Sequence, residues 1–164
     1  MDPRGGGGHD RVMASSTVYP PGLGTALIDL LAPVATEGRA TGKLFGGTDD
    51  ERTRGVLDAA SGLLSASLPR DLVGWALRTR GGPITMQLSG PVDTDGAWVL
   101  ADALRAATDR PGPVSLDGDG CAAFAIATGR AMSIGVCRRG RALQHDELWM
   151  VQSVALACHL AGRG

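Results

Sequence analysis

The sequence of 164 residues has no long apolar run, no excess of basic charge and no clustered cysteines. No apolar stretch approaches the roughly 20 residues that a membrane-spanning helix needs, and the Gly-rich start MDPRGGGGHD has no apolar core typical of a secretion signal. Lys and Arg total 16 against 17 Asp and Glu, so no positive field is present to gather phosphates. We therefore expect no membrane, no nucleic-acid partner and a cytoplasmic location.

The sequence also lacks the cysteine and histidine spacing of a metal site. Cys121, Cys137 and Cys158 are an odd number without CxxC pairs, which fits reduced thiols better than disulfides or structural zinc. Outside the N-terminal tail the histidines are His145 and His159, and neither has a second ligand four residues away. We expect no metal and no cofactor.

Composition divides the chain into three parts. Residues 1–20 are rich in Gly, Ser and Pro, bury little on ordering, and are predicted to be a disordered tail. Residues 21–47 contain a helical apolar spacing from Leu23 to Val34 and then a Gly-rich linker. Residues 48–164 carry the apolar periodicity of one domain, with 43% hydrophobic residues in the whole chain to supply a core.

Periodicity and turn residues give this domain an α/β (α+β) class with the element order α-β-β-α-β-β-β-α. Thr48-Asp49-Asp50-Glu51 has the form of a helix capping box, and Arg80-Gly81-Gly82-Pro83 that of a hairpin connection. We predict a central antiparallel sheet of about five strands with helices on both faces. The predicted elements are a helix at 49–67, strands at 72–78 and 84–89, a helix at 96–108, strands at 114–116, 121–128 and 131–138, and a helix at 146–160.

The last quarter, AMSIGVCRRGRALQHDELWMVQSVALACHLA, resembles the end of a GAF domain, a small regulatory module related to PAS domains. A strand with an internal glycine, Ile134-Gly135-Val136, is followed by a charged turn and by the helix start Gln144-His145-Asp146-Glu147-Leu148. The stretch LADALRAATDRPGPVSLDG is similar to the helix, turn and strand that wall a GAF pocket. The resemblance covers about residues 48–162. The same order of elements also describes roadblock-type dynein light chain domains, which are protein-binding scaffolds.

The GAF resemblance implies a stand-alone regulatory or sensor domain that binds a small molecule or a partner protein in signalling and performs no reaction. It also implies a homodimer, and the helix at 23–34 and the terminal helices together carry more apolar surface than one side of a sheet can cover. The segment from Ser89 to Cys121 is short and the cyclic-nucleotide signature is absent, so neither a cyclic nucleotide nor a tetrapyrrole is expected. High Ala, Gly, Arg and Asp with one Lys indicates a GC-rich bacterial genome.

Strand alternation gives the predicted sheet a large-residue face and a small-residue face. We expect the large face to lie beneath helix 96–108, and the helices at 49–67 and 146–160 to pack on the small face. An apolar or neutral ligand would then be lined by Trp75, Met86, Trp98, Phe124 and Met132. The alternative is that these side chains are simply core.

Two further features have chemical interpretations. Cys121 follows an Asp-Gly-Asp-Gly turn and is a weak candidate for a reactive thiol, because the free methionine sulfoxide reductases are GAF enzymes that work through cysteines. A thiolate needs a nearby positive charge, and the sequence suggests only Arg130. Arg138, Arg139 and Arg141 form a basic cluster that either binds an anion or is a solvated turn.

Overall fold

The computed structural model describes residues 49–91 and 93–161, and within them the predicted class and element order are confirmed. The elements in chain order are α2 (Asp49–Ser67), β1 (Leu72–Arg78), β2 (Ile84–Ser89), α3 (Thr94–Asp109), β3 (Pro113–Gly118), β4 (Cys121–Gly129), β5 (Met132–Arg139) and α4 (His145–Ala161). The tail, the predicted helix at 23–34 and the capping residue Thr48 lie outside the described residues. No helix within the described part is long and apolar enough to cross a membrane.

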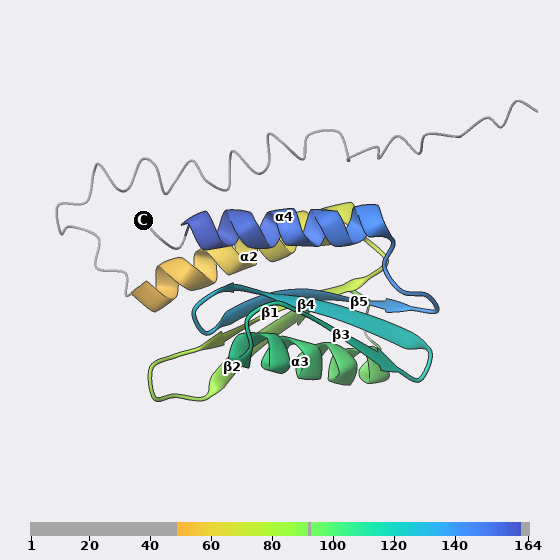
Figure 1. Cartoon of the computed structure of the whole chain (residues 1–164), viewed down its shortest axis with the longest axis horizontal. Coiled ribbons are helices and arrows are strands. Elements are labelled where there is room, and N and C mark those ends of the chain that lie inside the picture. Colours follow the sequence, from red (N-terminus) through yellow and green to blue (C-terminus); the bar gives the residue numbers. More distant parts are fainter. Residues whose placement is uncertain (1–48, 92, 162–164) are drawn as a thin grey trace, which may run out of the picture.

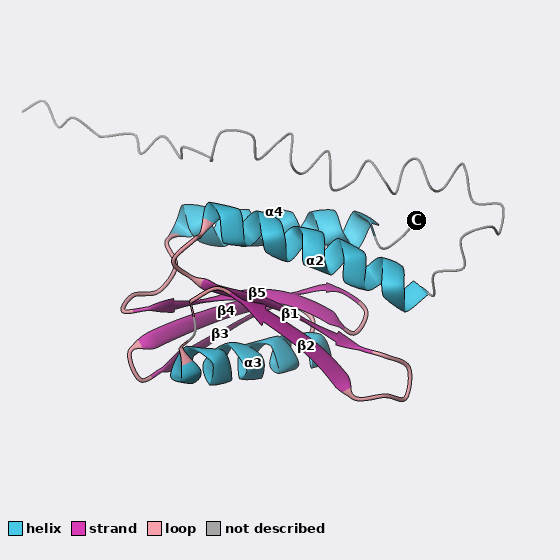
Figure 2. Cartoon of the chain, turned by 180° about the vertical axis from the view of Figure 1, so that it is seen from behind, coloured by secondary structure: helices cyan, strands magenta, loops and turns pink. Residues whose placement is uncertain are grey.

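The five strands form one open antiparallel sheet in the order β2-β1-β5-β4-β3. Figure 1 shows α2 and α4 side by side on one face of this sheet and α3 on the other. The view from behind in Figure 2 gives the same three layers. The domain is therefore a sheet between a two-helix layer and a single helix.

The predicted placement of the helices on the two faces is wrong. Val73, Trp75 and Leu77 point toward α2 and α4, whereas Leu72 and Ala76 pack with α3. The core cluster around α4 also contains the large strand residues of β4 and β5, which include Phe124, Ile134 and Val136. The two-helix layer thus covers the large face, and α3 covers the small face.

The sheet face predicted for the large residues of β2 is also wrong, because of the register of β2 on β1. Residues directly opposite each other in antiparallel strands share a face, and here Gly74 lies opposite Leu88 and Ala76 opposite Met86. Met86 and Leu88 therefore face α3 and not the side of Trp75. The alternation within each strand was predicted correctly, but the pairing between strands was not.

Small residues allow α3 to lie directly on the sheet. A Cβ atom added to Gly135 would lie 2.7 Å from the Phe124 carbonyl oxygen and 3.1 Å from Cδ1 of Leu100 on α3. Leu100 and Leu104 are fully buried in this layer, together with Ala103 and Ala107. Side chains thus fill most of the space where the sequence predicted a ligand.

Candidate functional site

The five residues predicted to line a pocket do not lie together. Trp75 and Met132 belong to a small cluster under α2, and Phe124 belongs to the core beneath α4. Met86 packs on the opposite face against the α3 cluster, and Trp98 on α3 is 67% exposed. No single cavity can contact all five, because the sheet separates them.

Trp75 has a structural role in this arrangement. Its ring is 2% exposed, and its Nε1–H donates a 2.8 Å hydrogen bond to Oδ1 of Asp58 on α2. Burying an indole requires a partner for its N–H, and Asp58 provides one at the helix surface. Trp75 therefore fixes α2 on the sheet, which agrees with the interpretation of this residue as core.

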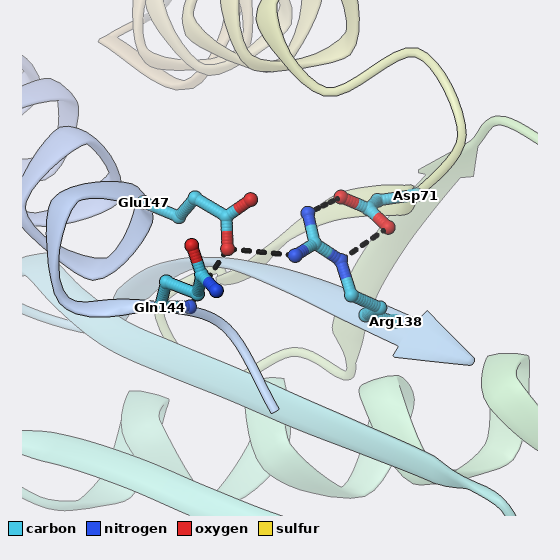
Figure 3. Close-up of polar contacts among 4 residues, drawn as sticks. All are labelled: Asp71, Arg138, Gln144 and Glu147. Atoms are coloured by element: carbon cyan, nitrogen blue, oxygen red, sulfur yellow. Dashed lines mark hydrogen bonds and ion pairs between the residues drawn. The ribbon is translucent and has the colours of Figure 1, made fainter. Parts of the chain in front are cut away.

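The basic cluster is divided among separate partners. Arg138 donates from Nε and Nη2 to the two carboxylate oxygens of Asp71 at 3.0 and 2.6 Å, and from Nη1 to Oε2 of Glu147 at 2.6 Å (Figure 3). The Asp71 side chain is 4% exposed and that of Arg138 13%. Arg139 donates to Asp93 at 2.7 and 3.0 Å, and Arg141 is exposed. Arg138 is thus part of a buried ion-pair network and is not free to bind a phosphate.

This network also explains the helix-start motif in the sequence. The carboxylate of Glu147, in the first turn of α4, accepts the backbone N–H of Gln144 at 2.7 Å, as the acidic residue of a capping box does (Figure 3). Burial alone would raise the pKa of Glu147, but the hydrogen bond from Gln144 and the pair with Arg138 outweigh it and lower that pKa. The hydrogen bond to Asp71 raises the pKa of Arg138. The motif therefore joins α4 to β5 and to the loop before β1.

The cysteines and histidines of the described residues lie on β4, β5 and α4. Cys158 lies on the buried face of α4, and burial raises its thiol pKa to about 12. Cys121 starts β4 and Arg130 follows the end of that strand, so the predicted activating charge lies at the wrong end. His159 lies 3.2 Å, through Nδ1, from the Thr128 carbonyl oxygen. The described residues contain no group of three His, Cys, Asp or Glu side chains that could hold a metal.

The outer surface of α4 carries an apolar stripe, which we define as Trp149, Leu156 and Leu160. These side chains are 52%, 59% and 51% exposed, although they are large and apolar. Spacings of seven and eleven residues place them on one side of the helix. The segment from Leu148 to Ala161 contains no Asp, Glu, Lys or Arg. The inner face of α4 is in the core as predicted, and the outer stripe is the surplus apolar surface that the sequence indicated.

A groove of about 690 Å³ adjoins the stripe through Leu156. Its other lining residues come from α4, from the end of β4 and the β4–β5 turn, and from the end of α3 and the segment that follows it, and include Ile126, Arg130 and Arg110. The stripe runs along α4 and meets this groove at Leu156. This surface is the candidate functional site.

Comparison of the sequence with protein-family models and with curated proteins finds no match.

Proposed function

We propose that this chain is a GAF-like regulatory domain that performs no reaction and acts by binding protein, first of all a second copy of itself. The observation that supports this proposal is the apolar stripe on α4. Half-exposed large apolar side chains without intervening charge are the composition of an interface core. Reduced thiols and the absence of a membrane-spanning helix in the described part fit the cytoplasmic location that we propose.

The stripe suits a symmetric contact between two copies. A two-fold axis near Ser153 and Val154 would pair Trp149 of one copy with Leu160 of the other, and the reverse pair would form by symmetry. The two α4 helices would run antiparallel, which also brings opposite ends of the helix dipoles together. A homodimer is therefore the occupant that the uncharged stripe favours.

A roadblock-like scaffold without a ligand is the second candidate, and the packing of α3 supports it. The small face of the sheet is mostly filled by α3, and the cavity of about 240 Å³ that remains under the start of α3 is smaller than the roughly 300–1,000 Å³ of a typical ligand pocket. Native mass spectrometry of the protein purified from its own cells separates the two candidates. A small molecule that is present natively and lost on denaturation would favour the sensor, and a ligand-free dimer would favour the scaffold.

Sedimentation equilibrium of the full chain tests the proposed surface. We expect the wild-type protein to have twice the 16.8 kDa chain mass. Because Leu156 is only 59% exposed before association, Leu156→Glu removes roughly 0.8–1.5 kcal/mol of apolar burial from each copy, or about 1.5–3 kcal/mol per dimer, so the dimer dissociation constant should rise by about 10-fold to 100-fold. Trp98→Glu is the matched control, because Trp98 is 67% exposed on the opposite layer. A dimer that survives Leu156→Glu, or one that is lost in Trp98→Glu, would contradict the proposal.

A further inference from the structure

Two of the three cysteines lie next to each other beneath the start of α3. In the register of β4 and β5, Cys121 is opposite Arg139 and Cys137 is opposite Ala123, so the two thiols are diagonal neighbours on the α3 face. Cys121 is 6% exposed and Cys137 4%. The pair belongs to a different layer from Cys158.

Two glycines leave room for the sulfur atoms. A Cβ atom on Gly118 would lie 3.2 Å from Sγ of Cys121, and one on Gly96 would lie 3.6 Å from Sγ of Cys137. Both thiols line a cavity of about 240 Å³, which Arg70, Asp93 and Arg139 also line. A small ion can therefore reach two sulfur atoms in a setting that carries both signs of charge.

The spacing of a diagonal pair favours a bridging atom over a direct bond. Diagonal neighbours in antiparallel strands have Cα atoms roughly 7–8 Å apart, whereas disulfides usually span about 4.4–6.8 Å. A thiophilic ion would bind by displacing the proton of each thiol.

The two sulfur donors determine which metal ion this site can bind. Structural zinc takes four ligands, and no third His, Cys, Asp or Glu joins this pair within the described residues. Soft thiolate ligands favour Cu(I), which is stable with two sulfur ligands.

We propose that Cys121 and Cys137 form a two-thiolate site for Cu(I). Binding forms two sulfur–copper bonds, releases one proton from each thiol to solvent and leaves the copper oxidation state unchanged. The bound unit carries one net negative charge. Arg139 in the same cavity is already paired with Asp93, so the guanidinium group of Arg70 would offset this charge. This site is independent of the α4 surface.

The test is an anaerobic titration of the reduced full-length protein with Cu(I) in competition with a chromogenic Cu(I) chelator. We expect one Cu(I) per chain for the wild type and for Cys158→Ser, and at least 100-fold weaker binding for Cys121→Ser and for Cys137→Ser. Circular dichroism confirms that each variant is folded. Unchanged binding in Cys121→Ser or Cys137→Ser, or loss of binding in Cys158→Ser, would overturn the proposal.

X-ray absorption of the copper-loaded wild type gives a readout that needs no variant. Two sulfur neighbours around each copper would support the site, and nitrogen or oxygen neighbours would contradict it. A wild-type chain that takes up no copper, and instead loses two hydrogens by mass on mild oxidation, would show a disulfide in place of the proposed site.

Discussion

The neighbouring arginines Arg138 and Arg139 provide a controlled test of burial, because each pairs with an aspartate but in a different environment. The side chains of Arg138 and its partner Asp71 are 13% and 4% exposed, whereas those of Arg139 and Asp93 are 74% and 23% exposed. Arg138→Met removes the charge and most of the hydrogen bonds of Asp71 while keeping apolar bulk. An uncompensated buried carboxylate of this kind costs about 3–5 kcal/mol. A domain of this size has about 5–15 kcal/mol of stability in all, so the loss is large.

The assay is urea unfolding of the two variants and the wild type near neutral pH, followed by circular dichroism. Arg138→Met should shift the midpoint strongly downward with an unchanged slope, because the surface exposed on unfolding is the same. Arg139→Met should leave the midpoint almost unchanged, since exposed ion pairs contribute little. Equal losses in the two variants, or the larger loss in Arg139→Met, would refute the argument from burial.

Three further predictions concern packing, pH and a buried donor. Gly135→Ala should destabilise the domain by about 1–3 kcal/mol, because α3 and the neighbouring strand leave no room for a Cβ atom. Gly62→Ala in α2 has open space around it and should stabilise the domain by about 0.5–1 kcal/mol. Thermal unfolding of the two variants and the wild type measures both effects. Folding lowers the pKa of Glu147 below its usual value of 4.5. The ionised carboxylate therefore stabilises the fold at any pH above 4.5, and this stabilisation is lost as the pH falls through the lowered pKa of the folded state. The stability difference between wild type and Glu147→Gln should therefore narrow in acid, and a constant difference would contradict this. Asp58→Ala leaves the indole N–H of Trp75 without its 2.8 Å partner and should cost about 1–3 kcal/mol in urea unfolding, where no change would argue against that bond.

The order of elements could be predicted because the signals that set it are local. The bounds of β1 and β2 agree with the apolar alternation and the Gly-Gly-Pro turn between them. The last strand begins one residue later than expected, because Ala131 adopts a φ of 63° in the turn before it. Strand β3 is longer than expected, since its ends are set by hydrogen bonds to β4 and not by its own residues.

The faces of the sheet and the site could not be predicted in the same way, because they depend on contacts between distant residues. The register of β2 decides whether Met86 shares a face with Trp75, and nothing in either strand alone encodes it. Arg138 and Asp71 are separated by 67 residues, so their ion pair is invisible to motif analysis. The surplus apolar surface of the terminal helix was detectable from the sequence. Its position on the outside of α4 follows only from the packing of the inner face on the sheet.

The most direct test of the proposed dimer is cross-linking through a cysteine placed at the centre of the α4 stripe. Ser153 lies in that position on α4, and the natural cysteines are buried. Under mild oxidation, Ser153→Cys should form a disulfide-linked dimer efficiently, because the two-fold axis brings this residue next to its own copy. Trp98→Cys, on the opposite layer, should stay monomeric on a denaturing gel. Failure of Ser153→Cys to cross-link, or equal cross-linking of the two variants, would contradict a dimer formed through α4.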